Sequence, residues 1–192
     1  MPSSNTRVPS YSSLSIALHW LIAALILTNV GLALLWDPLM HSADPAQKAR
    51  AVTMVDFHKS FGLTVLVLSL VRLGNRVAHG FPRLPDDMRT WERVLARSTH
   101  YAFYALMIGV PLLGYLMVSV SPRQMPIHYL HLFDLPLLPL GVSKTLDDQL
   151  GAAHGFLAWS TMALLALHIA GALKHRFVNH DGVLARMLPI TR

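Results

Sequence analysis

Four long runs of apolar residues alternate with polar segments along the chain. They cover residues of about 16–36, 57–78, 101–120 and 150–173. Each run has about 20 residues, and an α-helix of that length, rising about 1.5 Å per residue, crosses a hydrocarbon core of about 30 Å. Backbone groups in lipid must be hydrogen-bonded within their own segment, so each run predicts a transmembrane helix. The predicted fold is all-α, a single four-helix transmembrane bundle formed by residues 1–192.

The longest predicted connection is the segment 121–149, between the third and fourth apolar runs. It contains a second apolar patch, residues 135–140, which is too short to cross a bilayer. We expect this outer loop to lie at the membrane interface and to cover the bundle. Within the third run, Pro111 predicts a kink in the helix.

Charged residues make up 14% of the chain, well below the roughly 25% of an average soluble domain. If the N-terminus is cytoplasmic, eleven Lys and Arg residues fall on the inner side and five on the outer side. The positive-inside rule then places both termini in the cytoplasm. The net charge of +6 reflects this asymmetry, and no nucleic-acid partner is expected. The inner residues are Arg7, Arg72, Arg76, Arg83, Arg89, Arg93, Arg97, Lys174, Arg176, Arg186 and Arg192, and the outer ones are Lys48, Arg50, Lys59, Arg123 and Lys144.

Histidine is the residue type in this chain that indicates a candidate functional site. The chain has eleven histidines and no cysteine, which excludes disulfides, iron–sulfur clusters and thiolate zinc sites. Ionisable residues inside a membrane are costly and mark candidate functional sites. Four histidines meet this description: His19, His58, His154 and His168.

These four histidines form two pairs by depth. His154 and His168 are 14 residues apart on one predicted helix, so they lie about 40° apart around its axis and about 21 Å apart along it. His58 shares the outer depth with His154, and His19 shares the inner depth with His168. Two planar cofactors, each clamped between two helices, would use all four, and neutral imidazole is a good axial ligand for haem iron.

Three other interpretations of these histidines remain open at this point. Each could be an ordinary hydrogen-bonded packing residue. A zinc or copper site would need three or four ligands at one depth, whereas the pattern gives two and two. A transporter or channel could use the histidines for protons or metal, and such a protein would be colourless.

Several motifs along the chain resemble those of the bacterial cytochrome b561 family, small four-helix di-haem proteins of the inner membrane. The resemblance covers nearly the whole chain. The motifs are Ser-Ile-Ala-Leu-His-Trp at 15–20, His-Lys-Ser-Phe-Gly at 58–62, Arg72 with Arg76, His100 followed by Val-Pro-Leu-Leu-Gly at 110–114, Lys-His-Arg-Phe at 174–177 and Leu-Ala-Arg-Met-Leu-Pro at 184–189.

The resemblance implies a function. It implies two haems b, ligated by His19 with His168 and by His58 with His154, and ubiquinone as redox partner in the bacterial inner membrane. Some members are superoxide oxidases, which pass an electron from periplasmic superoxide to quinone. We therefore expect an electron-carrying oxidoreductase surrounded by membrane lipid. The alternative is a non-catalytic relay subunit for a dehydrogenase or hydrogenase partner.

Five further residues are candidates for contacts with the cofactors. Arg72, Arg76 and Lys174 lie near the inner surface, where they could pair with haem propionates or simply anchor the helices. Lys59 adjoins His58 and could neutralise an outer propionate, attract an anion such as superoxide, or snorkel to the surface. His100 begins the third helix and could bind a propionate or deliver a proton to quinone.

Overall fold

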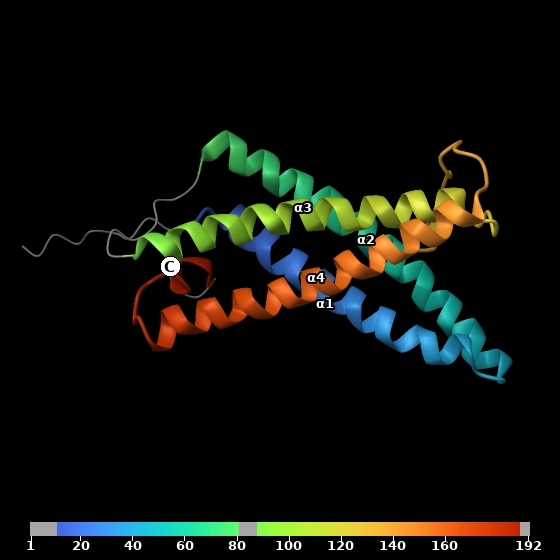
Figure 1. Cartoon of the computed structure of the whole chain (residues 1–192), viewed down its shortest axis with the longest axis horizontal. Coiled ribbons are helices and arrows are strands. Elements are labelled where there is room, and N and C mark those ends of the chain that lie inside the picture. The colour runs from blue at the N-terminus through green and yellow to red at the C-terminus, as the bar shows by residue number, and fades with distance from the viewer. Residues whose placement is uncertain (1–10, 81–87, 189–192) are drawn as a thin grey trace, which may run out of the picture.

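Four long helices dominate the computed structural model, which describes residues 11–80 and 88–188 (Figure 1). They are α1 (Ser13–Met40), α2 (Pro45–His79), α3 (Thr90–Val120) and α4 (Lys144–Phe177). Each is long and apolar enough to cross a membrane, so the prediction of four membrane-spanning helices is confirmed. Arg7, Arg83, Pro189 and Arg192 lie outside the described residues.

The helices extend past the apolar runs that predicted them. α2 begins at Pro45 rather than near residue 57, and α4 begins at Lys144 rather than near residue 150. Side chains at the N-caps explain these starts. The Asp44 carboxylate accepts from Ala46 N at 2.9 Å, and the Ser143 hydroxyl accepts from Leu146 N at 3.3 Å. Both satisfy backbone N–H groups that would otherwise lack a partner at the start of a helix.

The helices are arranged as two packed pairs. α1 packs along α2, α3 packs along α4, and α2 also contacts α3. Within the described residues, the backbone of α4 makes hardly any close approach to α1 or α2. A cavity lined by residues of all four helices lies within the bundle, and it contains part of the candidate site described below.

The two ends of the bundle differ in structure. At one end, which we call the termini side, Trp20 Nε1 donates to the Met187 carbonyl at 2.8 Å, and the short 3-10 turn η1 (Ala185–Met187) lies against the start of α1. At the other end, which we call the hairpin side, the segment between α3 and α4 forms two short antiparallel strands. These are β1 (Ile127–Tyr129) and β2 (Phe133–Leu135), with His128 opposite Asp134.

Large apolar side chains cover the outside of the helices. Leu34, Val67, Phe156 and Leu167 are each more than half exposed, and they come from three different helices. The fully buried positions include small polar residues, Ser60, Ser69 and Ser119. A helical bundle that is surrounded by lipid exposes apolar side chains on its outside and packs small residues inside.

Candidate cofactor site

The first of the two histidine pairs joins α2 and α4 on the hairpin side. The ring centres of His58 and His154 are 6.1 Å apart, with an angle of 69° between the rings. His58 Nδ1 donates to the Asn29 carbonyl at 3.1 Å, and His154 Nδ1 donates to the Val110 carbonyl at 3.0 Å. Since a carbonyl can only accept, each Nε2 keeps its lone pair. Metal-binding histidines are oriented by such bonds from their other ring nitrogen.

A cavity of about 440 Å³ surrounds this pair. All four helices and β1 contribute to its wall, which is mainly apolar and includes both histidines, Trp36, Lys59 and Gly62. A mostly apolar cavity of this size with a few polar groups is typical of sites for cofactors. The amide oxygen of Asn29, another lining residue, is buried without a hydrogen bond to any described residue.

The second pair lies on the termini side and has a third imidazole beside it. The ring centres of His19 and His168 are 6.3 Å apart, and those of His100 and His168 are 5.9 Å apart. Both pairs have an interplanar angle of 67°. His19 comes from α1, His100 from α3 and His168 from α4, so three helices converge here.

The spacing in both pairs fits two ligands on opposite faces of one metal. A metal–imidazole bond is about 2 Å and the ring centre lies about 1 Å behind the nitrogen, so two such ligands have ring centres roughly 6 Å apart. Among the residues that the structure describes, no three His, Asp or Glu side chains are close enough to hold a small metal ion. Two imidazoles at each site, with a cavity around the hairpin-side pair, fit the ligation of a haem.

The candidate arginines interact with the start of α1. Arg72 Nη1 donates to the Ser15 carbonyl at 3.1 Å, and the Arg76 guanidinium lies 5.1 Å above the Tyr11 ring. Arg72 is also within electrostatic range of all three termini-side imidazoles. Arg72 is therefore well placed to meet an acidic group of a ligand held there.

The two candidate lysines are both paired with acids. Lys59 Nζ lies 3.3 Å from Asp56 Oδ1, and both side chains are largely buried beside the cavity. Lys174 pairs with the buried Glu92 carboxylate and lies 5.3 Å from the centre of the Trp91 ring. Lys174 thus ties α4 to α3, and its role towards a propionate stays a prediction.

Gly114 ends the Val-Pro-Leu-Leu-Gly motif, but its contact with the site was not predicted. A Cβ atom there would lie 3.1 Å from His154 Cε1 and 3.2 Å from His154 Nδ1. Of the other glycines near the candidate histidines, Gly62 and Gly151 approach other side chains, whereas Gly155 and Gly171 have open space around them. Only the distance between α3 and α4 reveals the role of Gly114.

Replacing Gly114 by alanine should displace the His154 ring from its position. A contact of 3.1 Å is tighter than nine in ten Cβ contacts, so the ring would have to move by a few tenths of an ångström, and the Val110 carbonyl holds it in place. We expect a purified G114A variant to bind less haem at the hairpin side, or to show a shifted reduction potential. Gly109→Ala is the matched control, because a Cβ there meets nothing within 4 Å. Equal haem content and equal potentials in the two variants would contradict this role.

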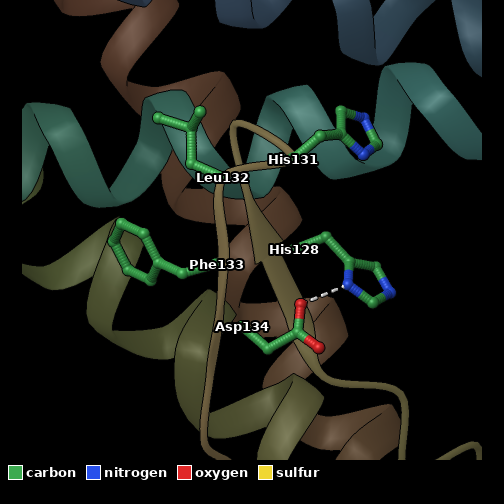
Figure 2. Close-up of a pocket in the computed structure, with 5 residues that line it drawn as sticks. All are labelled: His128, His131, Leu132, Phe133 and Asp134. Atoms are coloured by element: carbon green, nitrogen blue, oxygen red, sulfur yellow. Dashed lines mark hydrogen bonds and ion pairs between the residues drawn. The ribbon is translucent and has the colours of Figure 1, made fainter.

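The β1–β2 hairpin lies beside α2 (Figure 2), and hydrogen bonds fix it there. Ser60 Oγ accepts from Leu130 N at 2.9 Å and donates to the Asp56 carbonyl at 2.8 Å, and the Tyr129 and Thr64 hydroxyls are 2.8 Å apart. His128 Nδ1 and Asp134 Oδ1, 2.5 Å apart, face each other across the strands beside a hollow of about 380 Å³. The prediction of a loop covering the bundle did not include this hairpin.

Replacing Ser60 by alanine should loosen the hairpin. The variant leaves the part-buried Leu130 N–H without its acceptor, and such a hydrogen bond contributes about 0.5–1.5 kcal/mol. We expect faster amide hydrogen exchange at 127–135. Ser69→Ala is the control, because Ser69 is equally buried but its hydroxyl has no hydrogen bond to a described residue. If both variants exchange at the same rate, Ser60 does not anchor the hairpin.

The fold and the site together define a class: a multi-pass membrane protein with imidazole pairs suited to axial ligation of haem. Comparison of the sequence with known protein families leads to the same class. The family model described as prokaryotic cytochrome b561 matches residues 10–189, and the chain belongs to this family. It is a cytochrome of the bacterial inner membrane that takes part in electron transport, and the family implies haem b.

Three curated relatives span nearly the full length of the chain. "Cytochrome b561 homolog 2" of Escherichia coli (strain K12) is 32% identical over 184 residues, which cover 95% of this chain and 94% of that protein. "Cytochrome b562" of Cereibacter sphaeroides is 29% identical, covering 95% and 98%. "Probable superoxide oxidase CybB" of Yersinia pestis is 26% identical, covering 95% and 97%.

Proposed function

We propose that this protein holds two haems b and carries electrons between the periplasmic side of the membrane and the ubiquinone pool. The observation that carries the proposal is the presence of two imidazole pairs, His58 with His154 and His19 with His168, at opposite ends of one bundle with ring spacings of 6.1 and 6.3 Å. When bound, haem supplies a group that accepts and releases one electron.

We assign the hairpin side to the periplasm and both termini to the cytoplasm. Arg72, Arg76, Lys174 and Arg176 lie towards the termini side, in the last turns of α2 and α4 or close to them, and Arg89, Arg93 and Arg97 lie in or beside the first turns of α3. The hairpin side carries fewer basic residues, of which Lys59 and Lys144 are paired with acids. The positive-inside rule favours this orientation.

The residues at each site would hold a cofactor and prevent side reactions. The two imidazoles of each pair would hold the haem iron and leave it no open position for oxygen, which would favour electron transfer. Carbonyl groups fix both imidazoles of the hairpin-side pair, so their orientation is preorganised. Arg72 supplies positive charge near the termini-side imidazoles, where it can neutralise a propionate.

Superoxide is the electron donor that we propose for the periplasmic side. Two superoxide anions each lose one electron and become dioxygen, and one ubiquinone takes up those two electrons with two protons to become ubiquinol. Lys59 lines the hairpin-side cavity whereas its ion-pair partner Asp56 does not, so the cavity wall presents the cation of the pair, which suits an anionic donor. A relative from Yersinia pestis has the name of a probable superoxide oxidase, which supports this choice.

Two measurements on the detergent-purified protein test the proposal. Oxidised and dithionite-reduced spectra, with haem quantified per chain, should give two haems b. A superoxide-generating system should then reduce ubiquinone faster than in a sample without the protein. Absence of haem from protein expressed with adequate haem supply would contradict the cytochrome assignment. Two haems without superoxide-driven quinone reduction would contradict only the choice of donor.

A relay subunit for a soluble or membrane-bound dehydrogenase is the second candidate. Leu132 and Phe133, at and beside the turn of the hairpin, are 76% and 54% exposed, and an apolar tip of this kind can contact a partner protein. The relay function predicts that a dehydrogenase copurifies with the protein and that the haems are reduced only when this dehydrogenase is present. Isolation as a lone protein with full superoxide-driven activity would exclude it.

A further inference from the structure

The termini-side site has more imidazoles than one haem can use. The ring centre of His168 lies 6.3 Å from that of His19 and 5.9 Å from that of His100, at the same interplanar angle. Both distances match the roughly 6 Å expected for two ligands of one metal. An iron in a haem plane has two axial positions, so one of the three imidazoles remains unbound at any time.

α3 presents His100 on the face that packs against α4. Phe103, three residues further along α3, lies with its ring centre 5.3 Å from that of His168, and residues three apart share a helix face. His100 therefore approaches His168 from α3, while His19 approaches it from α1. His168 is the member that both possible pairs share.

The two sites also differ in how firmly their imidazoles are held. On the hairpin side, backbone carbonyls hold Nδ1 of both histidines. The ring nitrogens of His19, His100 and His168 make no hydrogen bond to any residue that the structure describes. Hydrogen bonds from the second ring nitrogen normally fix the orientation of a metal-bound histidine. The termini-side rings lack that restraint and are positioned by packing, with Trp20 beside His19 and Phe103 beside His168.

We propose that His100 is a reserve axial ligand, which binds the iron opposite His168 when His19 does not. The proposal rests on the haem binding proposed above. In the exchange, the bond from iron to the His19 nitrogen breaks and a bond from iron to the His100 nitrogen forms. Both ligands are neutral imidazoles, so no proton or electron is gained or lost. The hairpin-side pair has no comparable third imidazole among the described residues.

Haem content and electron paramagnetic resonance of purified variants test this exchange without an activity assay. We expect H19A to keep two haems per chain, with a low-spin bis-imidazole signal of altered g values at the termini side. The double variant H19A/H100A should keep one haem, and H100A alone should keep two. H58A should keep one haem, because no reserve imidazole serves that site. The proposal is overturned if the H19A variant loses a haem as completely as H19A/H100A does. It is also overturned if the two variants give an identical high-spin signal.

Controls separate this proposal from its basis and from misfolding. If the unmodified protein holds no haem, or if H168A and H154A each keep two, the haem assignment itself fails. The retained hairpin-side haem reports that H19A/H100A is folded. If the H19A/H100A variant is recovered without any haem, the H19G/H100A variant, purified in the presence of free imidazole, is tested in its place. Recovery of the second haem by added imidazole shows a folded site, and removal of the imidazole should then empty it. Retention after removal would contradict the reserve role of His100.

Discussion

Replacing His154 by alanine is expected to leave one haem per chain and to abolish electron transfer across the membrane. His154 supplies one of only two imidazoles on the hairpin side, and its ring centre is 6.1 Å from that of His58. Loss of a second-shell partner typically lowers metal affinity about 10–100-fold, and loss of a direct ligand costs more. The termini-side haem should remain, because its histidines lie about four helical turns away along α4.

The haem content and the spectrum of each variant measure this effect. Potentiometric titration of H154A should show a single redox transition where the unmodified protein shows two. Phe156→Ala is the matched control, since Phe156 lies two residues away on the same helix and is 71% exposed towards lipid. It should keep two haems and full activity. Two haems in H154A would mean that His154 is not a ligand.

The helices could be predicted because lipid imposes a simple requirement on their sequence. Every spanning segment needs about 20 apolar residues and must satisfy its own backbone, so composition alone locates it. The helix ends were less predictable. The stretch from Pro45 to Asp56 contains Lys48, Arg50 and Asp56, so it does not look like a membrane segment, yet the Asp44 cap and the apolar run that follows keep it helical.

The hairpin could not be predicted from local sequence. Its strands have only three residues each, and its turn places Leu130 and His131 at φ values of 50° and 56°. Turns with two positive φ angles favour Asn-Gly or Asp-Gly, and neither pair is present. Contacts with Ser60 and Thr64, which are more than 60 residues away in sequence, hold the hairpin in this conformation.

The sequence predicted those features of the candidate site that depend on the depth of each histidine in the membrane. The spacing of His154 and His168 on one helix predicted two sites, and the structure brings His58 and His19 to them. The additional imidazole of His100, the carbonyl of Asn29 and the close approach of Gly114 depend on distances between helices. Such distances leave no periodic signal in a single sequence.

Replacing Lys59 by methionine is expected to slow superoxide-driven haem reduction about tenfold and to weaken its dependence on ionic strength. Positive charge at a cavity raises the association rate of an anion, and salt screens this attraction. The change also breaks a buried ion pair with Asp56, which typically costs about 3–5 kcal/mol. A slower rate could therefore come from lost charge or from a damaged site.

Two further variants separate these causes. Lys59→Arg keeps the charge and should keep the rate, while the double variant D56N/K59M removes both charges, so that no unpaired carboxylate remains buried. We expect thermal unfolding, followed by haem absorbance, to show lower stability for K59M and partial recovery for D56N/K59M. Stopped-flow mixing with superoxide should show both to be slow. If D56N/K59M regains the rate together with the stability, Lys59 acts through its ion pair with Asp56, and attraction of the anion is not its role.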